Sequence, residues 1–286
     1  MEHRADTLAQ SRFLEAIVGM PVPTKKTGKS VYRTLIPINR LMKDDLVRPI
    51  LQDEPSGFCS VLSKQTGVML VTYPCRSDEI MNVALFHTTR ADQRDKDDWN
   101  SPASVEDMLD QLKVGFHPAW SALFKQADSA NCYTVNHRDP VPRMVRGKVA
   151  LIGDAAHPMQ PTHAQGGAMG IEDAGALEVL FSNFGANDSV ERRLELLNQL
   201  RIPRNTVTAL YSNAMFYNES SAQIESRIRE HYQGRLLPPQ ADGWSVPIQD
   251  FFFPYDVFAE AKKAMQYEAQ GKIPEGVITN FGEVAA

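Results

Sequence analysis

Asp154 is the first residue whose type and position suggest chemistry. It follows Gly153 at the end of an apolar run, residues 149–152 (Val-Ala-Leu-Ile). A continuous apolar run is typical of a strand that is buried on both faces. Because ligands of doubly wound sheets bind at the carboxyl ends of their strands, Asp154 is a candidate ligand-binding residue.

A run of small residues follows a few positions later and forms a second candidate site. After Pro161 come Ala164, Gln165, Gly166 and Gly167, and an Ala/Gly/Met/Leu-rich stretch continues to residue 184. This stretch predicts a helix that begins near Gly166. Since small residues leave the first backbone N–H groups and the positive end of the helix dipole accessible, this helix start suits a group that gains negative charge.

The elements around these residues are predicted from turn residues and periodicity. Short strands are expected at 31–36, 58–62, 68–73, 80–87 and 130–137, with a hairpin turn at Gly67, which favours an antiparallel sheet. Helices are expected at 11–18, after a cap at Ser104, and over most of the chain beyond 187, with breaks at Pro203 and at Pro238-Pro239. Residues 91–99 are expected to form a charged surface loop, and residues 251–255 a loop that packs inward.

The composition argues against several classes of protein. The 286 residues are 43% hydrophobic and 23% charged with a net charge of −5, which does not favour a nucleic-acid partner. No apolar stretch approaches the ~18 residues of a membrane span and no apolar signal core follows the first residues, so we expect a cytoplasmic protein with no membrane partner. The three cysteines, and His157 and His163 six residues apart, predict neither a disulfide framework nor a metal site.

The glycines exclude one common nucleotide-binding turn. No two of the 17 glycines are separated by a single residue, so G-x-G-x-x-G occurs nowhere in the chain.

The segment 147–174 resembles the second flavin-binding motif of the FAD-dependent aromatic hydroxylases, in particular the salicylate-hydroxylase-like group. The resemblance implies that Gly153 and Asp154 bind the ribityl chain of FAD. It also implies that Pro161 lines the face of the flavin where oxygen is activated, which makes it the catalytic candidate. The pyrimidine edge would be held by four residues: Ala164, Gln165, Gly166 and Gly167.

Other segments resemble the same family, over about residues 11–260. They are Tyr32-Arg33-x-Leu35-Ile36-Pro37, Tyr73-Pro74-Cys75-Arg76, Arg138-Asp139-Pro140 and Pro254-Tyr255-Asp256-Val257. By this resemblance Tyr32, Tyr73 and Arg76 line the substrate face of the sheet, although a role as ordinary half-buried strand residues is equally open. Glu172 and Asp173 are interpreted as a solvated or capping pair, and His157 as a structural member of the motif.

The resemblance implies an α/β (α+β) fold that is part of an FAD/NAD(P)-binding hydroxylase, without the N-terminal Rossmann βαβ unit. The expected segments are a remnant linker and helix (1–19), a substrate-binding sheet domain (20–145), a flavin-contacting strand–turn–helix (146–185) and a helical C-terminal region (186–286). One departure concerns Ala164, which replaces a glycine of many relatives. A helix start tolerates alanine unless the position needs a positive φ.

The implied activity is that of an FAD-dependent monooxygenase that uses NAD(P)H and O₂ to hydroxylate a small aromatic or related metabolite. Two alternatives stay open: a cofactor-free cyclase or isomerase that uses the same pocket, and an inactive truncated relative with a binding or structural role, or an incomplete sequence. A homo-oligomer, or a second chain that supplies the missing half, is a possible partner.

Overall fold

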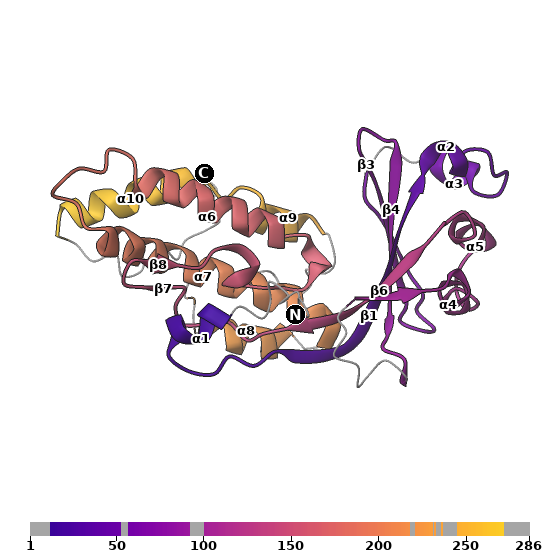
Figure 1. Cartoon of the computed structure of the whole chain (residues 1–286), viewed down its shortest axis with the longest axis horizontal. Helices are drawn as coiled ribbons and strands as arrows, with labels where there is room; N and C mark the ends of the chain where they lie inside the picture. The colour runs from indigo at the N-terminus through magenta and orange to yellow at the C-terminus, as the bar shows by residue number, and fades with distance from the viewer. Residues whose placement is uncertain are drawn as a thin grey trace, which may run out of the picture. The chain divides into compact units, whose positions relative to one another are not determined.

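The computed structural model describes residues 12–52, 57–91, 100–217, 221–230, 232, 236 and 245–271 (Figure 1). The chain forms two compact units. One unit is continuous from Lys26 to Asn136, and the other combines the residues up to 25 with those from 137 onward. Residues 92–99 of the expected charged loop and the expected break at Pro238-Pro239 lie outside the described residues.

The unit formed by residues 26–136 is built on a six-stranded sheet with the order β2-β3-β4-β1-β6-β5. The β1–β4, β2–β3, β3–β4 and β5–β6 pairs are antiparallel, as the sequence predicts. Gly67 adopts a φ of +69° in the turn between β2 and β3. The strands are β1 (Lys25–Pro37), β2 (Cys59–Leu62), β3 (Met69–Cys75), β4 (Ile80–Thr88), β5 (Asn100–Ala103) and β6 (Ala130–His137).

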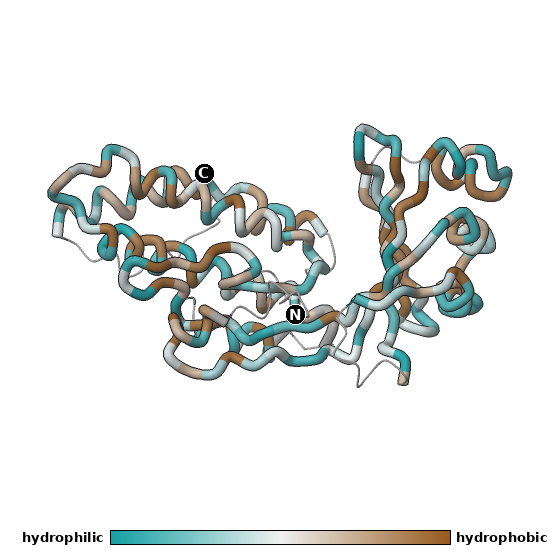
Figure 2. Tube along the Cα trace, viewed as in Figure 1, coloured by the Kyte–Doolittle hydropathy of each residue, from teal (hydrophilic) through white to brown (hydrophobic). Residues whose placement is uncertain are grey.

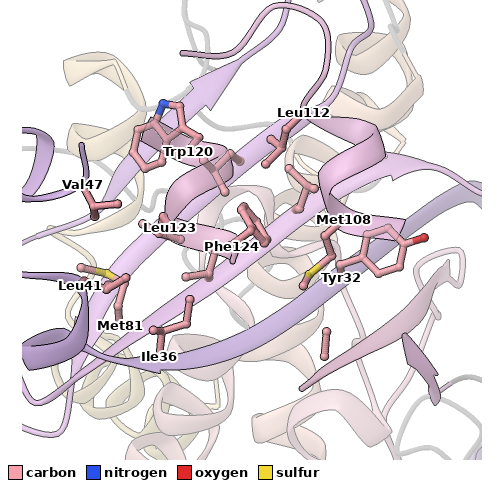
Figure 3. Close-up of a cluster of buried hydrophobic side chains, with 14 of the residues drawn as sticks. Tyr32, Ile36, Leu41, Val47, Met81, Met108, Leu112, Trp120, Leu123 and Phe124 are labelled. Atoms are coloured by element: carbon pink, nitrogen blue, oxygen red, sulfur yellow. The ribbon is translucent and has the colours of Figure 1, made fainter. Parts of the chain in front are cut away.

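Four short helices cover one face of this sheet (Figure 1). They are α2 (Ile38–Leu41), α3 (Arg48–Gln52), α4 (Val105–Gln111) and α5 (Pro118–Phe124). Figure 3 shows the core between them and the sheet, where Phe124, Leu123 and Met108 meet Ile36 and Met81. Brown stretches of the tube in Figure 2 mark apolar residues of this unit, and those of β3 and β4 that belong to this core include Leu70, Val83 and Leu85. The expected cap of α4 is confirmed, because Ser104 and Asp107 form a reciprocal capping box.

The other unit is mostly helical. The helices α6 (Gly166–Leu180), α7 (Val190–Tyr217) and α10 (Val257–Ala269) pack on one another around Leu180, Leu197 and Ala261. A second apolar cluster contains Phe251, Phe252 and Tyr232. The remaining elements are α1 (Arg12–Val18), β7 (Val145–Arg146), β8 (Val149–Ala150), the 3₁₀ helices η3 (Gly153–Ala155) and η4 (Pro161–His163), α8 (Ser221–Arg229) and α9 (Val246–Phe252).

The apolar run at 149–152 is not a strand buried on both faces, which corrects the prediction. Its only strand is β8, which forms a two-stranded hairpin with β7. Val149 is 52% exposed and Ile152 is 42% exposed. The physical reason is that β7 is the only strand paired with β8 among the described residues, so no parallel sheet flanks it.

Three predictions about helices and the segments beside them also need correction. The helix α7 runs through Pro203 without a break, because the packing of α7 on α6 and α10 outweighs the backbone hydrogen bond that proline removes. Phe251 and Phe252 belong to α9 rather than to a loop, although both are buried as expected, whereas Phe253 is exposed. The helix α6 ends at Leu180, four residues earlier than expected.

Candidate active site

The turn that carries Asp154 is a tight 3₁₀ helix, η3, and its first residue has the left-handed backbone conformation that favours glycine. Gly153 has a φ of +57°, and its carbonyl oxygen accepts hydrogen bonds from the N–H groups of Ala156 and His157, both at 2.9 Å. The turn also lies against α6, since a methyl group on Gly170 would come within 3.5 Å of the Gly153 Cα atom. The close approach of two glycines therefore fixes the turn beside the first turns of α6.

The start of α6 presents uncovered backbone, as the sequence predicts. Among the described residues no side chain caps this helix, and the Gln165 amide instead donates to the His163 carbonyl oxygen at 3.1 Å. Gly167 is exposed and has no atom within 4 Å of the place where a side chain would begin. At Gly166 that place is 3.8 Å from Asp154 Oδ1. The carboxylate of Asp154 and the free N–H groups of α6 thus lie side by side.

The segment between η3 and α6 is anchored by buried side chains and leaves Pro161 on the surface. Pro161 is the exposed first residue of η4. The next residue, Thr162, is buried and donates its hydroxyl hydrogen bond to the Ser212 carbonyl oxygen on α7 at 2.6 Å. Ala164 ends η4 with a φ of +50° and a ψ of +28°, a left-handed conformation. The position therefore needs the positive φ that glycine adopts most easily.

Glu172 and Asp173 are not a solvated or capping pair, which corrects the sequence interpretation. Asp173 is fully buried, and its Oδ1 atom accepts from Arg201 Nε at 2.8 Å. Glu172 accepts from Arg201 Nη1 at 2.6 Å and from Arg204 Nη2 at 3.0 Å. Both arginines are fully buried on α7. The two carboxylates and two guanidinium groups form a buried ion cluster, because each buried charge needs an opposite charge beside it.

The second carboxylate oxygen of Asp173 faces the Gly153 turn. Asp173 Oδ2 accepts from the Gly153 N–H at 2.9 Å and from His157 Nε2 at 2.6 Å. Burial by itself raises the pKa of Asp173, but the hydrogen bond from His157 and the charge of Arg201 outweigh it and hold this pKa below its usual value. His157 is buried, in agreement with the structural role that the sequence suggested.

Arg138 is a further residue of this region that sequence reasoning assigned no role. It is buried, and its Nη2 atom donates to the Asp154 carbonyl oxygen at 3.4 Å. Burial lowers the pKa of Arg138, and the Asp154 carboxylate opposes this shift. The signal that could have found Arg138 is its place in the Arg138-Asp139-Pro140 segment. The signal for the ion cluster is the pair of adjacent acids in the first half of α6, which otherwise consists of small and apolar residues.

The structure does not bring the three expected substrate residues onto one surface. Tyr32 is fully buried in the core beneath the helices and stacks on His87 with ring centroids 4.3 Å apart. Tyr32 pairs with Leu85 of β4 whereas Tyr73 pairs with Asn82. Because side chains alternate along a strand, the two tyrosines point to opposite faces of the sheet. Arg76 is exposed in the β3–β4 turn with a φ of +53°.

Metal-binding clusters and membrane-spanning helices are both absent from the described part of the chain. Within those residues, no three His, Cys, Asp or Glu side chains lie close enough together to hold a metal ion. None of the described helices combines the length and the apolar character that a membrane crossing requires.

Solved structures similar to this chain define its fold. A salicylate hydroxylase–substrate complex superposes with a TM-score of 0.63 and 22% identity over 88% of this chain and 60% of that chain. CtdE in complex with FAD and a substrate superposes with a TM-score of 0.70 and 17% identity over 92% of this chain and 61% of that chain. The fold is therefore that of the FAD-dependent hydroxylases, over most of this chain.

Residues 21–209 match the FAD binding domain family. The chain belongs to this family, within the FAD-binding monooxygenases that are similar to salicylate hydroxylase. Two curated relatives are FAD-dependent monooxygenases: cfoG of Aspergillus candidus, 30% identical over 90% of this chain, and phomE′ of Diaporthe leptostromiformis, 28% identical over 91%. The chain spans 58% of the first relative's length and 64% of the second's.

Proposed function

We propose that this chain supplies the flavin-facing site and the substrate-binding sheet of an FAD-dependent monooxygenase that hydroxylates a small aromatic compound with NAD(P)H and O₂. The observation that carries the proposal is the juxtaposition at Gly166. There the Asp154 carboxylate and the uncapped start of α6 lie together on an open surface.

The residues at this surface fit the groups of a flavin that they would hold. A carboxylate accepts hydrogen bonds from hydroxyl groups, so Asp154, set by the Gly153 turn, would bind the ribityl chain. The segment Ala164–Gly167 would face the pyrimidine edge, where the positive end of the α6 dipole stabilises negative charge. The N–H of Ala164 donates to the Pro161 carbonyl oxygen at 3.1 Å, so the N–H groups offered to the flavin are those at the start of α6. Nothing stands within 4 Å of the bare Gly167 position, and Pro161 presents an exposed apolar ring at the start of η4.

When bound, FAD would supply the redox chemistry and the reaction with O₂. The tasks of the protein are to orient the ring, to stabilise charge on it and to exclude water. Gly153, Asp154 and Ala164–Gly167 would perform the first two tasks. Pro161 would limit access of water to the reacting face, since its side chain has no polar group and its backbone carries no N–H.

The substrate class is proposed from relatives and from the sheet. The 6-hydroxynicotinate 3-monooxygenase of Bordetella bronchiseptica is 32% identical to this chain over 181 residues, and its name specifies a small aromatic acid. We propose that the substrate lies on the sheet face that carries Tyr73, with Arg76 at its edge. Tyr32 would act from the opposite face, by packing beneath the strand.

The test is transfer of one labelled oxygen atom. The purified chain, with FAD, NADH or NADPH and ¹⁸O₂, is offered salicylate, 6-hydroxynicotinate and 3-hydroxybenzoate. We expect substrate-stimulated oxidation of NAD(P)H and one ¹⁸O atom in the product. Asp154→Ala is expected to abolish this activity, whereas Asp110→Ala, which removes an exposed carboxylate of α4, is expected to keep it. Absence of ¹⁸O from the products of all three substrates would contradict the proposal.

A further inference from the structure

Asp173 connects the turn that carries Asp154 to a buried arginine on α7. Its Oδ2 atom accepts from the Gly153 N–H and from His157 Nε2, at 2.9 and 2.6 Å, and its Oδ1 atom accepts from Arg201 Nε at 2.8 Å. We propose that Asp173 is a positioning residue: it fixes the Gly153–His157 turn, and thereby the orientation of Asp154 toward the flavin. The part that concerns flavin rests on the proposed function.

The close approach of Gly153 to Gly170 packs the turn against α6, but few polar contacts besides those of Asp173 set its orientation. Its internal hydrogen bonds, from the N–H groups of Ala156 and His157 to the Gly153 carbonyl, close the turn but do not attach it to the protein. The Arg138 contact with the Asp154 carbonyl is long, at 3.4 Å. One oxygen atom of Asp173, Oδ2, instead accepts hydrogen bonds from both the first residue of the turn, Gly153, and the last, His157. A shift of that oxygen therefore moves the whole turn, including Asp154.

Arg201 sets the position of that oxygen by binding the other oxygen of the same carboxylate, Oδ1. Besides Asp173, it donates to Glu172, to the Met169 carbonyl oxygen at 3.2 Å and to Asn205 Oδ1 at 3.1 Å. These acceptors on α6 and α7 fix the guanidinium group, and its Nε atom then fixes one edge of the Asp173 carboxylate. Because hydrogen bonds to ionised groups are short and directional, the arrangement transmits the geometry of the two helices to the turn.

The substitution Asp173→Asn tests whether Asp173 positions the turn or only balances the charge of Arg201. It keeps the shape of aspartate but replaces one acceptor oxygen with a donor NH₂ group. Arg201 cannot lose its proton, so the remaining oxygen turns toward it, and the NH₂ group faces the turn. His157 can exchange its ring proton for a lone pair at Nε2, but the Gly153 N–H can only donate. The Gly153 amide therefore loses its acceptor.

Hydrogen exchange of the Gly153 amide in the full chain without FAD tests this inference. In Asp173→Asn we expect exchange at Gly153 and in the 153–157 turn to become at least about tenfold faster, as loss of one hydrogen bond to a charged group implies. The matched control is Glu172→Gln. It disturbs the same ion cluster through Arg201 and Arg204 but no hydrogen bond of the turn, so exchange there should stay within about twofold of the original chain.

Affinity for FAD provides the second readout. We expect Asp173→Asn to weaken FAD binding by about tenfold or more, and Glu172→Gln to leave it near the original value. If the original chain bound no FAD, the proposed function would fail, while the exchange data would still decide whether Asp173 positions the turn. Unchanged exchange at Gly153 in Asp173→Asn, or an equal increase in Glu172→Gln, would overturn the inference.

A second variant covers the case in which Asp173→Asn does not fold. His157→Phe keeps the buried pair of Asp173 and Arg201 and removes only one anchor of the turn. We expect faster hydrogen exchange of the backbone amides at positions 156 and 157, and unchanged exchange of the amides in α7. No change in the turn would contradict the positioning role.

Discussion

Ala164 is strained in a way that its sequence neighbours do not reveal. A helix start tolerates alanine in place of glycine unless the position needs a positive φ, and the structure gives this residue a φ of +50°. The left-handed region costs a residue with a Cβ atom about 1–2 kcal/mol. Ala164 lies between η4 and the start of α6, where this left-handed conformation turns the backbone from one helix into the other.

Replacement of Ala164 by glycine should therefore stabilise the protein. The relieved strain exceeds the additional unfolded-state entropy of glycine, and we expect a gain of about 0.5–1 kcal/mol in the free energy of unfolding. Denaturant unfolding measures it. The matched control is Ala168→Gly inside α6, which should destabilise by about 1 kcal/mol. A loss of stability in Ala164→Gly would show that the left-handed conformation is not the one in solution.

Asp173 gives the stability a defined dependence on pH. Its pKa is held below the ordinary value of about 3.9, so the unfolded chain binds a proton at higher pH than the folded chain does. The contribution of Asp173 is complete above about pH 5 and is lost as the pH falls below 4, through the folded pKa. The melting temperature of Asp173→Asn should therefore fall less steeply than that of the original chain as the pH is lowered from 5 to 3. An equal fall of the two melting temperatures over this range would contradict the prediction.

At the scale of elements, sequence patterns correctly predicted the features that depend on residues close together in the chain. The strands of the sheet and the cap at Ser104 follow from alternation and turn residues that lie within a few positions of one another. The burial of Asp173 could not be predicted in this way, because its partner Arg201 is 28 residues distant on another helix. Pro203 failed as a helix break for the same reason, since packing of α7 overrides a local preference.

The exposure of β8 likewise depends on parts of the chain that are distant in sequence. Its apolar sequence was correctly identified as a strand at Val149–Ala150, but burial depends on neighbouring strands, which the run itself does not specify. For the site, the sequence identified the Gly153 turn and the open helix start. It missed the ion cluster and grouped Tyr32 with Tyr73 across the sheet, because the register that places a side chain on one face is set by pairing.

The capping box of α4 gives a prediction for a single element. The Ser104 hydroxyl accepts from the Asp107 N–H at 3.1 Å, and Asp107 Oδ2 accepts in return from the Ser104 N–H. Ser104→Ala should lower the free energy of unfolding by about 1 kcal/mol, whereas Ser104→Thr, which keeps a capping oxygen, should lower it by less. Chemical denaturation of the two variants measures the difference. Equal losses would mean that the cap contributes nothing.

At the scale of the whole molecule, residues 26–136 should fold by themselves. This segment is continuous, forms one compact unit and contains its own apolar core beneath α2–α5 (Figure 3). Segments with these properties form independent domains. The excised segment should show a cooperative thermal transition by circular dichroism. Leu85→Ala, in its core, should destabilise it by about 2–5 kcal/mol. A non-cooperative transition in the unmodified segment would contradict its independence.

Titration of the purified chain with FAD tests most directly whether the start of α6 binds the flavin of FAD. We expect binding with a Kd in the micromolar range or below. Gly167→Asp places a negative charge in the first turn of α6, where it stabilises the helix but repels a negatively charged ligand. This variant should bind FAD at least about tenfold more weakly than Gly167→Ala, which adds only a methyl group to open space. No binding by the original chain, or equal affinity in the two variants, would contradict the claim.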